Sequence, residues 1–138
     1  MSSFERFKGM MDAEALTIDS ELFSSANTGL MAVAGDLDAH TFEQFSDAIH
    51  GVLESGCTQL FIDLKFVDYI SSAGVGVLFS ALQRTEERGG QLVLLNPRET
   101  VKSVLDMLGA TSFFSIREGR LASAPFDSTE NFSNRIDY

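Results

Sequence analysis

Residues 60–82 of the chain read LFIDLKFVDYISSAGVGVLFSAL, and this stretch decides the fold. Its first part, residues 60–64, is nearly continuously apolar, which is typical of a buried central strand. Its last part, residues 75–82, carries apolar side chains at helical spacing. Ser71-Ser72-Ala73-Gly74 lies between the two. The sequence therefore predicts a serine hydroxyl at the N-terminus of a helix that follows a strand.

Strand and helix patterns continue to alternate on both sides of this stretch. Gly56, Gly89 and Gly109 each follow an apolar helical face, and glycine is common just past the end of a helix. Gly35-Asp36-Leu37-Asp38 is expected to end the strand that precedes it. The pattern predicts strands at residues 15–23, 30–34, 60–64, 92–95 and 113–116, and helices at residues 40–55, 75–88 and 97–108.

The order β-β-α-β-α-β-α-β predicts an α/β fold in which an N-terminal β-hairpin is joined to βαβαβα units. Such units form a mainly parallel mixed sheet packed with helices. The 138 residues suffice for one domain with its own core. We assign residues 15–117 to this domain. Residues 1–14 are interpreted as a leader, and residues 118–138 as a polar C-terminal tail that is partly ordered at best.

Composition narrows the possible partners. The chain has 20 acidic residues, 10 basic residues and a net charge of −10. This predicts no direct binding to nucleic acid or to a membrane surface, because both require clustered Lys and Arg, whereas a protein with a basic face is a suitable partner. Cys57 is the only cysteine, which excludes an intrachain disulfide. Together with the lack of a secretory or membrane-spanning pattern, this predicts a cytoplasmic protein.

Ser72 is the leading candidate for a functional side chain. As a plain helix cap, its hydroxyl would bind a free backbone amide, which is worth about 1 kcal/mol. As a phosphoacceptor, it would carry nearly two negative charges at the positive end of a helix dipole. Spacing alone leaves both interpretations open. Gly74 and Gly76 either permit a close approach of the backbone or relieve crowding between helix and sheet.

Asp36 and Asp38 follow the second predicted strand and are expected on the same edge of the sheet as Ser72. Two neighbouring carboxylates can bind a cation or act as acid and base. Turn formation and capping of the following helix explain them more simply. The acidic edge can still contact a partner protein.

The patterns of several enzyme classes are incomplete. Asp63 has the position of a receiver-domain phosphoaspartate, but no lysine lies near residues 113–116. A triad of Ser72 and His40 would lack the Gly-x-Ser-x-Gly motif. Neither His40 nor His50 has a nearby cysteine or second histidine for a metal site, and no phosphate-binding glycine loop occurs. We therefore predict no enzymatic activity, no cofactor and no metal.

Three segments together resemble the STAS domain of bacterial anti-sigma factor antagonists: Gly35-Asp36-Leu37-Asp38, Phe61-Ile62-Asp63-Leu64 and the block from Val67 to Leu78. The resemblance runs from about Leu16 to Arg117. In that family the phosphorylated serine lies two residues before the glycine that opens the helix, which is Ser72 here. The partner-binding residues implied by this resemblance are Asp36, Asp38, Ser71, Ser72, Gly74 and Val75.

The resemblance implies a phosphoprotein that regulates transcription by partner switching. In this family, the unphosphorylated antagonist binds an anti-sigma factor that is also an ATP-dependent serine kinase, and a sigma factor is released. Phosphorylation, here of Ser72, separates the complex, and a PP2C-type phosphatase restores the serine. ATP and magnesium belong to the kinase. The alternative is a STAS module without switching, either a scaffold of a stress-signalling assembly or a subunit of a lipid-transport complex, with Ser72 only as a cap.

Two departures from the family pattern accompany this resemblance. Ser71 stands where aspartate is frequent in the family, and the difference is expected to alter kinase preference. The family commonly ends with a helix after its last strand. Pro125 and the many small polar residues of 119–138 disfavour such a helix here.

Overall fold

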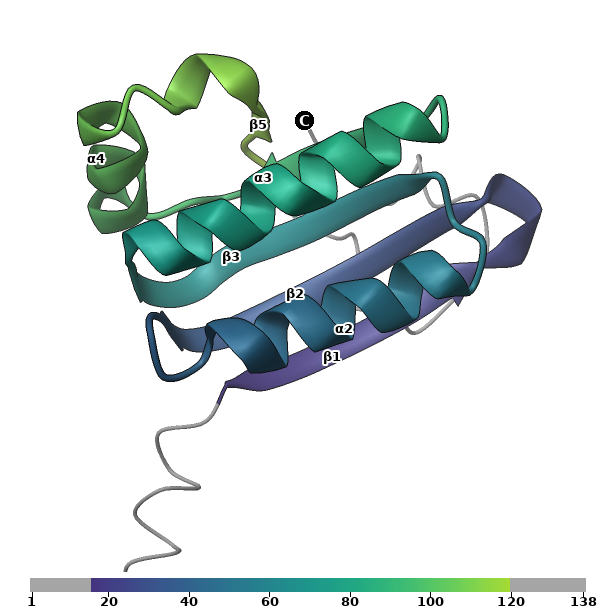
Figure 1. Cartoon of the computed structure of the whole chain (residues 1–138), viewed down its shortest axis with the longest axis horizontal. Helices are drawn as coiled ribbons and strands as arrows, with labels where there is room; N and C mark the ends of the chain where they lie inside the picture. Colours follow the sequence, from purple (N-terminus) through teal and green to yellow (C-terminus); the bar gives the residue numbers. More distant parts are fainter. Residues whose placement is uncertain (1–15, 120–138) are drawn as a thin grey trace, which may run out of the picture.

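The computed structural model describes residues 16–119. Its centre is a five-stranded sheet in the order β1-β2-β3-β4-β5 (Figure 1). β1 pairs antiparallel with β2, and the other neighbours are parallel. The elements are β1 (Thr17–Phe23), the 3-10 helix η1 (Ser24–Ala26), β2 (Thr28–Leu37), α2 (Phe42–Glu54), β3 (Gln59–Ile70), α3 (Ser72–Glu87), β4 (Gln91–Leu95), α4 (Glu99–Met107), the 3-10 helix η2 (Thr111–Phe113) and β5 (Ser115–Arg117).

The predicted fold class is confirmed, since the chain forms an α/β fold with an N-terminal β-hairpin and a mainly parallel mixed sheet. The predicted leader, residues 1–14, lies outside the described residues, as do residues 120–138 of the predicted tail. Within residues 16–119, no helix combines the length and apolar character that crossing a membrane requires.

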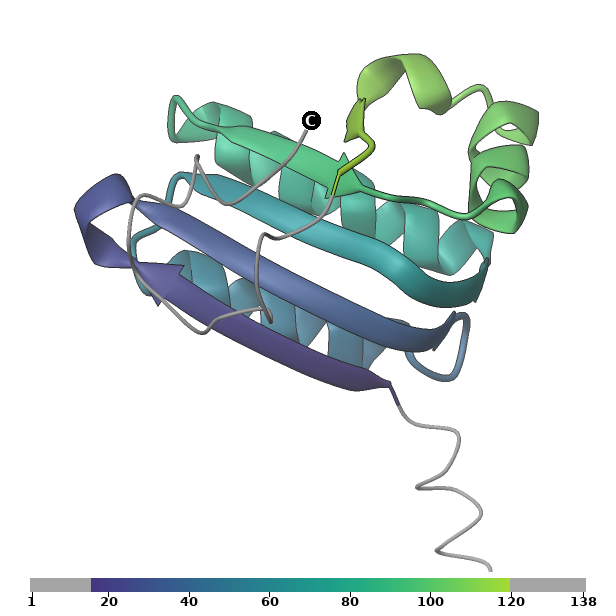
Figure 2. The same cartoon turned by 180° about the vertical axis from the view of Figure 1, so that it is seen from behind.

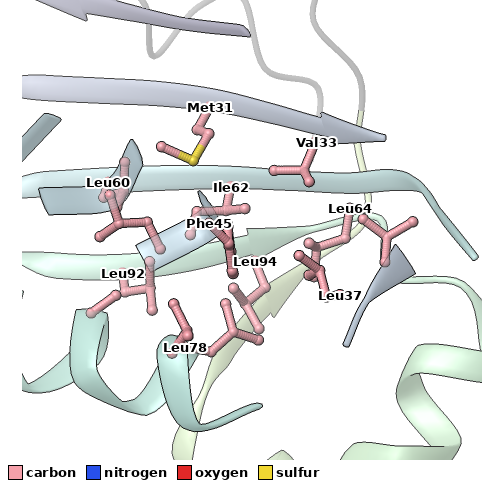
Figure 3. Close-up of a cluster of buried hydrophobic side chains, with 14 of the residues drawn as sticks. Met31, Val33, Leu37, Phe45, Leu60, Ile62, Leu64, Leu78, Leu92 and Leu94 are labelled. Carbon is pink, nitrogen blue, oxygen red and sulfur yellow. The ribbon is translucent and has the colours of Figure 1, made fainter. Parts of the chain in front are cut away.

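One large core lies between the sheet and the helices. α2 and α3 lie across the same face of the sheet, and α4 adds the buried side chains of Val101 and Leu105 (Figures 1 and 2). Alternate residues of the three inner strands point into this layer and meet Phe45 of α2 and Leu78 of α3. The labelled strand residues in Figure 3 are Met31, Val33, Leu37, Leu60, Ile62, Leu64, Leu92 and Leu94.

β3 is the central strand that the apolar run at residues 60–64 predicts. Leu60 and Ile62 are buried in the core beneath the helices, whereas Phe61 is buried in a separate cluster on the opposite face. A strand buried on both faces needs apolar residues at consecutive positions, which explains the lack of alternation in the sequence. β3 continues beyond the predicted end to Ile70, so it leads directly into the start of α3.

The prediction that Gly35-Asp36-Leu37-Asp38 ends the second strand is wrong. β2 pairs with β3 through Leu37, and the pairing register shifts twice, between Ala32 and Ala34 and between Gly35 and Asp36. Gly35 has φ 119°, a conformation that glycine adopts without a steric penalty. The glycine therefore bends the strand as a bulge does, and the hydrogen bonding to β3 continues past it.

Two further boundaries differ from the predictions. The first helix begins at Phe42 and not at His40, because residues 38–41 form a turn closed by the bond from Phe42 N to Asp38 O at 2.9 Å. Phe113 belongs to the 3-10 helix η2 and not to the last strand, which starts at Ser115. A short apolar run does not distinguish one helical turn from a strand.

Cys57 is a buried thiol beside the end of α2, and its Sγ donates to Val52 O at 3.5 Å. Burial raises the pKa of this thiol above its ordinary value, although the nearby Arg88 guanidinium partly opposes the shift. Because the thiolate is the reactive form, we expect Ellman's reagent at pH 8 to modify Cys57 at least about 100-fold more slowly in the folded protein than in 6 M urea. Equal rates would contradict the burial of this side chain.

Candidate functional site

The candidate site is the junction of β3 and α3. Ser71 has extended backbone angles, φ −98° and ψ 175°, and its Oγ accepts a hydrogen bond from Gly74 N at 3.4 Å. Val75 N donates to Ser71 O at 3.0 Å, which is the first bond of the helix. Ser71 is therefore the N-cap. The interpretation of Ser72 as the helix cap is wrong by one residue, because the strand pairing continues to Ile70 and places Ser71 at the boundary.

Ser72 is the first residue of α3, and its side chain is exposed. Its hydroxyl forms no hydrogen bond with any residue of the described chain 16–119. The first turn of α3 contains no acidic side chain, so nothing in that turn neutralises the positive end of the helix dipole. The structure thus presents a free hydroxyl at the end of a helix that favours negative charge.

Gly74 permits a close contact between α3 and the end of β2. A Cβ atom at this position would lie 2.7 Å from Ile70 Cγ1 and 2.8 Å from Leu37 O. Of the two interpretations left open by the sequence, relief of crowding between helix and sheet therefore holds for Gly74. It does not hold for Gly76, where a Cβ would meet nothing within 4 Å. The two glycines have different roles although they lie two residues apart.

Asp36 and Asp38 lie on the same edge of the sheet as the start of α3, as the sequence predicts. Leu37, the residue between them, pairs with Ile70 and accepts a hydrogen bond from Ser71 N at 2.8 Å. The β2–α2 turn and the start of α3 are therefore joined through the backbone. Asp36 is exposed and Asp38 is half-buried, so both add negative charge to this edge.

The Asp38 carboxylate stabilises the turn in which it lies. Its Oδ1 accepts a hydrogen bond from His40 N at 2.8 Å, and the hydroxyl of the buried Thr41 donates to Asp36 O at 2.6 Å. Asp38 N donates to the same Thr41 hydroxyl at 3.0 Å. The turn-forming interpretation of this pair is confirmed. Its capping part is wrong, because Thr41 occupies the N-cap position of α2.

The structure does not assemble the incomplete enzyme patterns that the sequence contains. His50 contacts Arg84 and Glu54 on the surface between α2 and α3, and Asp63 Oδ1 accepts from Lys65 N at 3.0 Å. In the described part of the chain, His40 forms no side-chain hydrogen bond to Ser72. Among residues 16–119, no group of three or more His, Cys, Asp or Glu side chains is arranged to hold a metal ion.

A groove of about 770 Å³ runs along the open side of α3, which the sequence reasoning missed. Gly76 and Ser80 continue the helical stripe that begins at Ser72, and the exposed ring of Phe113 forms the opposite wall. Phe113 packs edge-on against Phe79, with ring centroids 5.6 Å apart. The lining residues are Gly76, Phe79, Ser80, Leu82, Gln83, Glu86, Glu87 and Phe113.

Charge is distributed unevenly around α3. Arg84 and Arg88 turn towards α2, where Arg84 lies 3.8 Å from Glu54 and Arg88 donates to Leu53 O. Glu86 and Glu87 line the groove, and neither forms an ion pair with another residue of 16–119. The end of the groove far from Ser72 is therefore acidic.

The family model described as "STAS domain" matches residues 19–124. The chain belongs to the STAS domain family. An anti-sigma F factor antagonist of Lysinibacillus sphaericus is 29% identical over 83 residues, which cover 59% of this chain and 71% of that protein. The STAS fold also superposes on the anti-sigma factor antagonist SpoIIAA in its unphosphorylated form, with a TM-score of 0.63 and 24% identity over 74% of this chain and 87% of that one. For the Bacillus protein SpoIIAA in its phosphorylated form, the TM-score is 0.58 and the identity 22%, over 74% and 90% of the chains.

One feature of the sequence indicates the wall of this groove that α3 of the STAS domain forms. Ser72, Gly76, Ser80, Gln83 and Glu87 recur at helical spacing and contain no large apolar side chain, which marks a solvent-facing stripe. The second wall comes from Phe113 in η2, and β4 and α4 separate η2 from α3 in the sequence. No local pattern predicts that contact.

Proposed function

We propose that this STAS domain is an anti-sigma factor antagonist that is controlled by phosphorylation of Ser72. The observation that carries the proposal is the exposed Ser72 hydroxyl, which forms no hydrogen bond within residues 16–119 and lies at the positive end of α3. The protein from Lysinibacillus sphaericus is named an anti-sigma F factor antagonist, which supports the same function.

The chemistry of the switch follows from the position of Ser72. A hydroxyl is small and neutral, so a partner can pack closely against the start of α3. A phosphate adds about −1.5 to −2 charges and three acceptor oxygens. The helix dipole stabilises these charges within the domain, whereas a partner surface packed on Ser72 has to remove their hydration. The modification thus changes binding strongly and the fold little.

The other site residues divide into two groups in this proposal. Asp36, Asp38 and Ser72 reach the surface at one edge of the sheet, and we assign them to the partner contact together with the half-buried Ser71. Gly74 and Val75 are buried, so they act by fixing the start of α3 and not by touching the partner. Asp36 and Asp38 make the edge beside Ser72 acidic, and Glu86 and Glu87 make the far end of the groove acidic. Both regions suit a partner with a basic surface.

The partners in this proposal are an anti-sigma factor that is also a serine kinase and a PP2C-type phosphatase. The kinase supplies ATP and its magnesium ion, and this chain supplies only the acceptor hydroxyl. The γ-phosphoryl group of ATP is transferred to Ser72 Oγ, the hydroxyl proton passes to a base of the kinase, and ADP leaves. The phosphatase uses water to return the serine and inorganic phosphate.

The intact mass of the protein, purified from its own organism with and without phosphatase treatment, tests the proposal. We expect a fraction with one added phosphate, which fragmentation assigns to Ser72 and which phosphatase removes. Ser71 is the matched control, because it is adjacent and its hydroxyl is half-buried and engaged as the cap. A phosphate on Ser71 would overturn Ser72 as the acceptor. No phosphate after incubation with the kinases of that organism would favour a STAS scaffold without switching.

A further inference from the structure

The sheet face opposite the helices carries a second apolar cluster, which we call the rear cluster. It consists of Phe23, Leu30, Phe61, Val93 and Leu95. Leu30, Phe61 and Val93 are direct cross-strand neighbours in β2, β3 and β4. Leu30 is 0% exposed, Leu95 1% and Phe61 6%. Such values require a layer of atoms above the sheet, because side chains on an uncovered sheet face remain in contact with water.

No helix or strand of residues 16–119 supplies that layer. α2, α3 and α4 bury their apolar side chains in the core on the other face. Figure 2 shows α2 and α3 behind the sheet when the rear face is viewed, with α4 beside it. Glu21 of β1 pairs with Leu30, and its Oε2 atom is also buried, without a hydrogen-bond partner in the described chain. The cover therefore extends from β4 to β1 and comes from outside residues 16–119.

We propose that residues 120–138 form this cover and that Phe126 and Phe132 pack on the rear cluster. The described chain ends beside the cluster, since Arg117 pairs with Leu95, and Gly119 N donates to Asn96 Oδ1 at 2.8 Å. The family match also continues to residue 124, past the last described residue. Two large aromatic side chains supply the apolar area that the cluster needs.

The segment has enough reach for this task. β4 and β1 are three strand spacings apart, which is about 15 Å. Residues 120–138 span up to about 60 Å when extended. The segment can therefore cross the sheet from Leu95 to Phe23 and still place both phenylalanines over the cluster.

The alternative is that the N-terminal segment covers the rear cluster, and the position of Leu16 disfavours it. Leu16 is buried in the core on the helix side, where its backbone N and O bond to the Gln44 side chain of α2 at 3.1 and 2.9 Å. The first described residue is thus held on the helix side of the sheet. Thr17 also lies at the end of β1 that is far from Phe23. Residues 1–15 would have to pass around the edge of β1 to reach the rear cluster.

This assignment makes the C-terminal segment part of the domain and not a polar tail. It also confines the partner-binding surface to the helix side and to the edge that carries Ser72, because the rear face is already occupied. The proposal does not depend on phosphorylation or on the identity of any partner.

Nuclear Overhauser contacts in the full-length protein test the proposal directly. We expect contacts between the rings of Phe126 and Phe132 and the methyl groups of Leu30, Val93 and Leu95. Ring contacts from Phe4 or Phe7 to the same methyls would assign the cover to the N-terminal segment and overturn the proposal. Contacts between differently labelled molecules would assign it to a second copy of the chain and would overturn it as well.

Denaturation with urea gives an independent test that needs no assignment. We expect the double variant Phe126→Ser/Phe132→Ser to lower the midpoint by about 1–2 M and to bind a fluorescent apolar dye. The matched control is Phe4→Ser/Phe7→Ser, which makes the same chemical change in the other terminal segment and should leave the midpoint unchanged. Equal midpoints for both double variants would overturn the proposal.

Discussion

An alanine at position 74 is expected to lower the free energy of unfolding by about 2 kcal/mol. The added Cβ would lie 2.7 Å from Ile70 Cγ1 and 2.8 Å from Leu37 O. Leu37 O cannot retreat freely, because it accepts the hydrogen bond from Ser71 N at 2.8 Å that joins β2 to the start of α3. Gly74→Ala therefore forces apart the two segments that form the candidate site.

Gly76→Ala is the control for this prediction. It makes the same change in the same helix, but its Cβ meets nothing within 4 Å. Because alanine is the better helix former, we expect this variant to gain about 0.5–1 kcal/mol. Urea denaturation followed by circular dichroism measures both variants. A loss of stability for Gly76→Ala equal to that for Gly74→Ala would show that the contact with Leu37 is not the cause.

The sequence predicts the elements of this fold because their periodicities are strong and uninterrupted. Apolar residues at helical spacing identify α2 as a helix without tertiary information, and the short length of the apolar run in β3 favours a strand there. The edge that unites Ser72 with Asp36 and Asp38 follows from the same reasoning, since the carboxyl ends of parallel strands meet at one edge of a sheet. Family resemblance and physical pattern agree at these residues.

The errors occur where two local patterns have the same appearance. Gly35 is compatible with the end of a strand and with a bulge inside it, and only the pairing of Asp36 and Leu37 with β3 decides between them. Ser71 and Ser72 are both suitable cap residues. Ser71 becomes the cap because its backbone bonds to Leu37, a residue distant in the sequence. Neither choice is encoded in the segment itself.

Contacts between distant segments are the part of the site that the sequence does not predict. The groove requires Phe113 to lie beside Phe79, and Phe113 appears in the sequence as part of a strand. Likewise, the apolar character of Phe61 predicts that its side chain is buried, but it does not predict on which face of the sheet or beneath which segment. These features depend on packing, which periodicity does not contain.

Ser71 and Ser72 are expected to have separable roles although they are adjacent. Ser71→Ala should lower the free energy of unfolding by about 0.5 kcal/mol, the lower end of the range for a cap, because its bond to Gly74 N is long at 3.4 Å. Ser72→Ala should leave stability unchanged, since its hydroxyl bonds to no residue of 16–119. Only Ser72→Ala should abolish phosphorylation. If Ser71→Ala lost phosphorylation and Ser72→Ala kept it, the acceptor would be Ser71 and the proposed site would be wrong.

Phosphorylation of Ser72 is expected to weaken binding to the anti-sigma factor kinase by about 100-fold, which corresponds to roughly 2.7 kcal/mol. The phosphate stays solvated in the free domain and loses water when the partner packs against the start of α3. Ser72→Ala should retain the affinity of the unmodified protein, and Ser72→Asp, with one charge instead of two, should lose less than the phosphorylated form. Titration calorimetry with the kinase from the same organism measures all four proteins.

Variants at the acidic end of the groove test whether the phosphate acts by contact at Ser72 or through the overall charge of the domain. Glu86 lies fourteen residues after Ser72, which is about 21 Å along a helix. Glu86→Gln/Glu87→Gln removes two negative charges that face the groove and keeps the shape of both side chains. If a basic partner surface meets this end, the double variant weakens binding by about 3- to 10-fold and makes binding less dependent on salt. The ratio of the dissociation constants of the phosphorylated and unphosphorylated proteins stays the same. A change in that ratio would mean that the phosphate acts through the overall charge of the domain and not through contact at Ser72.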